Sequence, residues 1–174
     1  MPSLVLVVFM LAVPAMHAIA ASSTGSGTFA GTIGKEPASV TFKDVYAFRA
    51  QDSFDKTKQV TLVFLSDTPM DKKSMTAALR KEKDRRAIGK YLDNMAYARL
   101  EVNEDGEVKF FYFFRPPGFN YNLSGGGKSE VTVNTTKRVE GRFSREDTSA
   151  GGEPRKFDLR FATDVSDVGS PVRN

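Results

Sequence analysis

Strict alternation of apolar and polar residues recurs along most of this chain, and it limits the possible fold more than any other feature. In segment 156–161, phenylalanine and leucine alternate with charged residues; in segment 96–102, small and branched apolar residues alternate with Tyr97, Arg99 and Glu101. A period of two residues is typical of a strand with one buried and one exposed face. The pattern therefore predicts a domain built mainly from β-strands.

Turn signals between the alternating segments predict antiparallel hairpins. Asp105-Gly106 separates segment 96–102 from segment 107–114, and Asp-Gly between two such segments is a strong hairpin signal. A second hairpin is predicted around the turn 134–137. The predicted strands, about eight in all, are 28–33, 40–49, 59–65, 96–102, 107–114, 131–133, 139–143 and 156–161.

The period changes between Pro69 and Met95, where apolar residues follow helical spacing. Thr68, Pro69 and Asp71 stand in the order of a helix start. Two apolar stripes separated by a charged stretch predict two short helices after the third strand. The predicted fold class is mainly β (α+β): about eight antiparallel strands forming a small barrel or sandwich, with a two-helix insertion.

Residues 1–20 predict an export signal. They contain no charged side chain, and the apolar run ends in Ala18-Ile19-Ala20, which fits an A-x-A cleavage site. An uncleaved anchor is the alternative, but the run is short for a membrane span and Pro14 interrupts it. We therefore expect cleavage after Ala20, a periplasmic or secreted location, and no transmembrane span in the mature chain.

The composition of the flanking segments predicts the domain boundaries. Residues 21–27 are rich in serine and glycine and predict a flexible lead-in, and residues 166–174 predict a flexible tail. Residues 28–165 are predicted to form a single β-rich domain.

Missing residue types exclude several chemistries. The chain has no cysteine, which excludes disulfides, thiolate metal sites and cysteine nucleophiles. Its one histidine, His17, lies in the predicted signal, so the mature domain has no imidazole to act as a base or metal ligand. We therefore predict no cofactor, no metal and no enzymatic activity. A hydrolase using a pair of carboxylates from Asp44, Asp52 and Asp55 is the remaining enzymatic alternative.

The aromatic run 110–114, which leads into a Pro-Pro turn, is the most unusual stretch of composition. It fits a central strand buried on both faces. It also fits the mouth of a site for an apolar or sugar-like ligand, with Arg115 orienting a polar group. Asp44 interrupts an apolar face, which fits either a functional acid or a bulge that turns it outward. The candidate ligand-binding residues are Asp44, Phe111, Phe113, Arg115, Phe119 and Tyr121.

The helical segment 72–90 is strongly basic. It carries eight basic and two acidic residues, a balance of plus six, whereas the whole chain has a net charge of +4. This local charge fits contact with an anionic envelope component or a partner protein, and nucleic acid is not expected outside the cytoplasm. A solvated helix face explains the same residues. The candidate contact residues are Lys72, Lys73, Arg80, Lys81, Lys83, Arg85, Arg86 and Lys90.

Several segments resemble a group of uncharacterised exported bacterial proteins. They are Gly27–Ile33, Val45–Arg49, Phe54-Asp55, Val63–Pro69 and Val139–Arg142. In that group, short strands flank an LSD-x-P turn that opens a helical insertion, and Leu65-Ser-Asp-Thr-Pro69 is similar to this turn. The resemblance implies export and a fold of this kind, but no catalytic residue, cofactor or substrate. The sequence therefore predicts an exported, non-catalytic binding or interaction domain.

Overall fold

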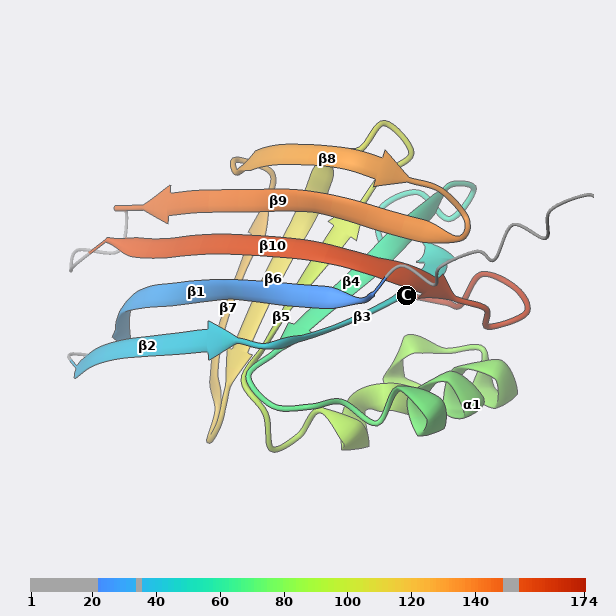
Figure 1. Cartoon of the computed structure of the whole chain (residues 1–174), viewed down its shortest axis with the longest axis horizontal. Helices are drawn as coiled ribbons and strands as arrows, with labels where there is room; N and C mark the ends of the chain where they lie inside the picture. Colours follow the sequence, from blue (N-terminus) through green and yellow to red (C-terminus); the bar gives the residue numbers. More distant parts are fainter. Residues whose placement is uncertain (1–21, 34–35, 149–153) are drawn as a thin grey trace, which may run out of the picture.

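The computed structural model describes residues 22–33, 36–148 and 154–174, so the predicted export signal lies outside it (Figure 1). Within these ranges the helical segments are α1 (Lys72–Glu82) and the 3-10 helix η1 (Arg85–Tyr91). The ten strands are β1 (Thr24–Ile33), β2 (Glu36–Phe42), β3 (Asp44–Gln51), β4 (Gln59–Ser66), β5 (Tyr97–Val102), β6 (Val108–Arg115), β7 (Phe119–Ser124), β8 (Lys128–Asn134), β9 (Arg138–Asp147) and β10 (Arg155–Ser166).

The strands form two curved layers that cross each other. One layer has the order β8-β9-β10-β1-β2, and the other contains β3 to β7 in chain order. All pairs are antiparallel except β10 with β3, where Val165 and Ser166 lie beside Ala47 and Phe48 and join the layers. Figure 1 shows the β3–β7 layer running obliquely behind the other. The prediction of a mainly β fold in the barrel or sandwich class is confirmed, in the form of a curled half-barrel.

Two apolar cores result from the alternation. On β3, Val45 and Ala47 face the space between the layers, and Tyr46 and Phe48 face the opposite side. The inner core fills the space between the layers. The outer core lies between β3, β4 and the helical insertion, which contributes Met70, Met75, Leu79, Ile88 and Leu92. The insertion therefore covers only one part of the outer face of the β3–β7 layer.

The number of strands exceeds the predicted eight for two local reasons. The predicted strand 40–49 divides at Lys43, whose N–H donates to the Ser66 carbonyl, so that β2 and β3 belong to different layers. The helical insertion consequently follows the fourth strand and not the third. The second additional strand is β7, which was not predicted from the sequence. Its apolar residues alternate with asparagine and serine, as in the other strands.

The helix start predicted at Thr68 and Pro69 is wrong by three residues. The N-cap of α1 is Asp71, whose carboxylate accepts from the Ser74 N–H. Asp71 is the better cap because its side-chain oxygen satisfies an N–H that the first helical turn leaves unpaired.

Both predicted flanks are partly held in the domain. The lead-in 21–27 was expected to be flexible, but β1 begins at Thr24 and pairs with β10. The tail 166–174 was also expected to be flexible, yet Val168 and Val172 are buried in the outer core. The Val172 backbone bonds to Arg49 and Gln51, which gives this segment partners that composition could not reveal. None of the helices in the described ranges has the length and apolar character needed to cross a bilayer.

Candidate functional site

Phe111 and Phe113, the centre of the predicted ligand mouth, are core residues. They are 1% and 0% exposed and lie on the inner face of β6. The Phe113 ring lies 4.7 Å from that of Phe29, and the Phe111 ring lies 4.6 Å from that of Phe157. Side chains fill the space between the layers at this level, so these two rings serve packing.

Phe119 and Tyr121 lie on the same inner face, at its rim on β7. Both are half-buried, and the Arg155 guanidinium lies 5.7 Å and 5.2 Å from their ring centres. The Tyr121 hydroxyl donates to the Asp147 carboxylate. Burial, together with this carboxylate, raises the pKa of Tyr121 to about 12. Arg115 pairs with Phe119 in the β6–β7 ladder. Five of the six predicted residues thus share one face.

Asp44 is the sixth, and it does not join them. Side chains alternate between the two faces of β3, so Asp44 lies on the same outer face as Tyr46. This face adjoins the start of the helical insertion. Its carboxylate accepts from the Met70 N–H at 2.8 Å and from Lys72 Nζ at 2.6 Å. A break between strands at Lys43, and not the suggested bulge, accounts for its position. Asp44 therefore anchors the insertion to the sheet.

Five of the eight basic candidates bind other parts of the domain. Lys72 pairs with Asp44, and Arg86 pairs with Asp84. The other three reach the C-terminal segment, where Arg80 binds Asp167, Lys83 binds the Val168 carbonyl and Arg85 binds Asn174. The exposed residues Lys73, Lys81 and Lys90 remain for an external anion. Three of the eight basic residues therefore help to hold segment 166–174 against the domain.

The outer face of β5 and β6 carries a set of side chains that the sequence did not single out as a site. Register pairs Tyr97 with Phe114, Arg99 with Tyr112, and Glu101 with Phe110, so all six lie on the face opposite the inner core. Phe110, Tyr112 and Phe114 are half-buried and belong to neither apolar core. We call this set the outer platform: Tyr97, Arg99, Glu101, Phe110, Tyr112 and Phe114.

Arg99 fixes the centre of the outer platform. Its guanidinium carbon lies 5.1 Å from the Phe110 ring centre and 5.5 Å from that of Tyr112, which are cation–π distances. The residue is only 8% exposed, and its Nη2 lies 3.4 Å from Glu101 Oε1. Burial and the nearby Arg85 charge lower the pKa of Arg99 to about 10. The two rings are thus held by a buried cation.

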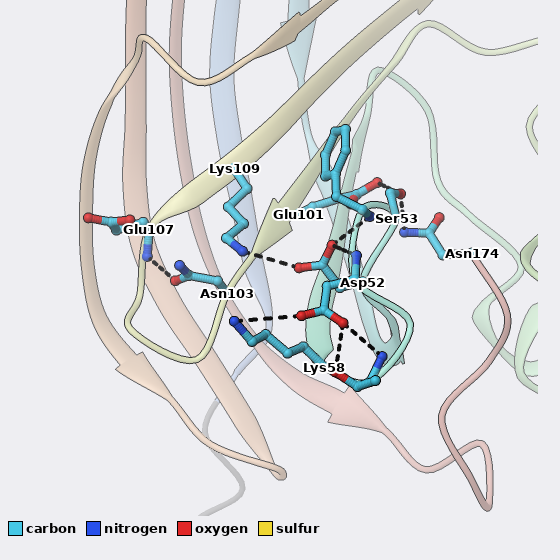
Figure 2. Close-up of polar contacts among 11 residues, drawn as sticks. Asp52, Ser53, Lys58, Glu101, Asn103, Glu107, Lys109 and Asn174 are labelled. Carbon is cyan, nitrogen blue, oxygen red and sulfur yellow. Dashed lines mark hydrogen bonds and ion pairs between the residues drawn. The ribbon is translucent and has the colours of Figure 1, made fainter.

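A chain of hydrogen bonds ties this ion pair to three other segments. Ser53 Oγ donates to Glu101 Oε1, and Asn174 Nδ2 donates to Ser53 Oγ (Figure 2). Arg85 Nε donates to Asn174 Oδ1. The three distances are 2.8, 2.8 and 2.7 Å. Glu101 is 1% exposed, and its Oε2 has no hydrogen-bond partner among the described residues. The network holds the loop after β3 against the edge of the platform.

Asp52 organises that loop. Its carboxylate accepts from the N–H groups of Phe54 and Asp55 and lies 3.3 Å from Lys109 Nζ (Figure 2). This arrangement presents Phe54, which is 64% exposed and is the one exposed large apolar side chain in the described part of the chain. The Phe54 ring lies 6.3 Å from that of Phe110. Phe54 therefore extends the outer platform toward solvent.

A groove of about 660 Å³ adjoins Phe54. Its walls include Glu107, Lys109, Ser129 and the glycine turn 125–127. Gly125 and Gly126 have φ of 74° and 78°, a left-handed conformation that favours glycine. A side chain at Gly127 would collide with the Phe143 ring. The turn thus presents backbone and no side chains to the groove.

Of the three acidic candidates, Asp52 and Asp55 lie in one loop, where the Asp52 carboxylate accepts from the Asp55 N–H, and Asp44 lies apart from them. Asp44 and Asp52 lie at opposite ends of β3, whose eight residues span about 26 Å. Burial opposes the charged form of Asp52, but its hydrogen bonds and Lys109 lower its pKa; bonds from Thr57 lower the pKa of Asp55. A general acid needs a raised pKa. Within the described ranges, no three acidic side chains gather as a metal site would require.

The lowered pKa of Asp52 predicts acid sensitivity. A carboxylate whose pKa is lower in the folded state stabilises the fold above its unfolded pKa, and this contribution is lost as the pH falls through the folded value. We expect Asp52→Asn to lower the free energy of unfolding most at pH 7. Below about pH 4 this loss should become smaller. Urea unfolding from pH 7 to pH 2 measures it, with the exposed Asp93→Asn as control. A difference that does not change with pH would contradict the assignment.

Comparisons with known proteins do not assign this chain to a family. No family model, no curated protein and no solved structure matches the chain.

Proposed function

We propose that this chain is an exported, non-catalytic binding domain that binds a sugar-like ligand on its outer platform and the adjoining groove. Export is supported by residues 1–20, and the absence of catalysis by the lack of cysteine and of histidine beyond His17. The observation that carries the proposal is the position of Phe110, Tyr112 and Phe114. They are three aromatic rings on a sheet face, outside both cores.

The rings suit the apolar face of a sugar. Sugar-like ligands present C–H groups on one side and hydroxyls around the edge, and half-buried aromatic side chains match the first while a polar rim matches the second. Asn120 and Asn122 lie exposed on the adjacent β7, in register with Phe114 and Tyr112. Their amides offer both donors and acceptors to hydroxyl groups.

The platform is also held in place by contacts within the domain. Arg99 packs against Phe110 and Tyr112, and Glu101 and Ser53 hold Arg99 and the neighbouring loop. A surface ordered in advance loses little conformational entropy on binding, which favours affinity. The proposed site therefore uses the aromatic strand that was singled out in the sequence. It uses the outer face of that strand, whereas the predicted ligand residues lie on the inner face.

Two matched tyrosine variants test this choice of face. Tyr112→Ala, on the outer platform, is expected to weaken binding about tenfold, since a well-placed aromatic contact contributes up to about 1.5 kcal/mol. Tyr121→Ala, on the inner rim, should leave the affinity unchanged. Calorimetric titration with neutral, acidic and N-acetylated oligosaccharides measures both, after circular dichroism has shown that each variant folds.

The opposite result would refute the proposed face. An affinity that depends on Tyr121 and not on Tyr112 assigns binding to the inner rim. Failure of all three classes of oligosaccharide to bind the parent protein would reject a sugar-like ligand.

A further inference from the structure

Three strands in the described part of the chain pair on one side only. Strand β2 pairs with β1, β8 pairs with β9, and β7 pairs with β6. The unpaired side of an edge strand presents free N–H and C=O groups that can accept another strand. Folded proteins usually protect such edges with charge, proline or a bulge.

Two of the three edges carry that protection. Strand β2 begins with Glu36 and Pro37, and a proline has no N–H to offer. Strand β8 carries Lys128 and Glu130, and its register shifts between Val131 and Val133. These features oppose the addition of a further strand.

Strand β7 has none of these features. Its sequence, Phe-Asn-Tyr-Asn-Leu-Ser, contains no charge and no proline, and its six residues pair with β6 without a register shift. Phe119, Tyr121 and Leu123 pack against the inner core, so the strand is held in place while its edge stays available. It is therefore a neutral template for strand addition, with an unbroken register and one face packed on the inner core.

The charges around β7 favour an acidic partner. Arg115 lies opposite Phe119 in the ladder, and Arg155 lies over the rings of Phe119 and Tyr121. Neither guanidinium has a carboxylate partner among the described residues. Arg145 donates to the carbonyls of Gly125 and Gly126. Arg155 Nε donates to the Thr32 carbonyl, and Asp147, whose carboxylate accepts from the Tyr121 hydroxyl, lies opposite Arg155 in the β9–β10 ladder. The guanidinium groups of Arg115 and Arg155 thus lie near the start of β7 without a carboxylate of the described residues bound to either, and guanidinium groups bind carboxylates strongly.

We propose that the free edge of β7 binds an extended segment of a partner protein, which adds a strand to the β3–β7 layer and places an acidic side chain beside Arg115 and Arg155. Main-chain hydrogen bonds along β7 supply affinity, and the two guanidinium groups select the sequence. The edge adjoins Asn120 and Asn122 of the proposed sugar site, but strand addition uses the β7 backbone and two arginines on the inner face, so it stands or falls independently of the sugar-like ligand.

The test uses two synthetic peptides on the full chain. Both alternate valine and threonine over six residues and carry one charged residue at each end, aspartate in the probe and lysine in its counterpart. Fluorescence anisotropy is expected to show tighter binding of the aspartate peptide, with the preference decreasing as salt rises. Amide hydrogen exchange should slow in residues 119–124 and not in 36–42 or 128–134.

Charge variants identify the side chains responsible. Arg155→Gln and Arg115→Gln are each expected to weaken binding of the aspartate peptide about fivefold, while Arg155→Lys retains most of it. Arg160→Gln, an exposed position on the outer face of β10, is the matched control and should have no effect.

Three outcomes would overturn the inference. They are equal binding of both peptides at low salt, exchange protection on β2 or β8 in place of β7, and protection of residues 119–124 that rises with protein concentration without peptide. The last would identify a second copy of this chain as the occupant.

Discussion

Replacing Phe113 by alanine is expected to lower the free energy of unfolding by about 3–5 kcal/mol, the usual cost of removing a buried phenylalanine ring. The residue is fully buried, and its ring contacts those of Phe29, Phe42 and Phe157. The neighbouring strands pair along their length and cannot collapse into the vacated space. Denaturant unfolding followed by circular dichroism measures the loss.

Phe54→Ala is the matched control for this loss. Its ring is 64% exposed, and we expect a change within about 0.5 kcal/mol. The pair also separates packing from binding, because Phe54 adjoins the groove and Phe113 does not. A Phe113→Ala variant as stable as the parent protein would mean that the space between the layers is loosely filled, and would restore the inner face as a ligand site.

Removing Glu101 is expected to have an effect of similar size for a different reason. Glu101→Ala leaves Arg99 buried without its counter-charge, and breaking a buried ion pair from one side costs about 3–5 kcal/mol. It also removes the acceptor of Ser53. The variant should therefore unfold at lower denaturant concentration than the parent protein.

The double variant Arg99→Met/Glu101→Leu tells whether the loss comes from the uncompensated charge. Replacing both partners by apolar residues of similar size is often neutral for stability, so most of the lost free energy should return. If the double variant is as unstable as Glu101→Ala, the hydrogen bond to Ser53 and not the Arg99 charge is the cause. The double variant also removes the cation between Phe110 and Tyr112, so we expect weaker binding on the outer platform despite the recovered stability.

Much of the fold followed from local patterns. The hairpin of β5 and β6 was predicted because the Asp105-Gly106 turn and the alternation around it are encoded by adjacent residues. The division at Lys43 was missed because it depends on a hydrogen bond to Ser66, more than twenty residues away. Val172 was assigned to a flexible tail because the side chains that bury it come from remote elements.

The candidate site was predicted less well, and β6 shows why. Its residues are apolar on both faces, so alternation cannot tell which face enters the core. The aromatic run fitted either a buried strand or a ligand mouth, and on the inner face the first holds, because Phe111 and Phe113 are packed. A usable signal was present in β5, where Arg99 and Glu101 were expected to point outward. Pairing them across the hairpin would have placed Phe110 and Tyr112 on the outer face as well.

The pairing of β1 with β10 determines when this domain can fold. Phe29, near the start of the described chain, lies opposite Phe157, near its end, and β10 also pairs with β9 and joins the layers through β3. Contacts between residues so far apart in the chain form slowly, because a long loop must close before they contribute. A chain that lacks β10 leaves β1 and β9 each without a neighbour, so the half-barrel is completed only when β10 joins the strands that were made before it.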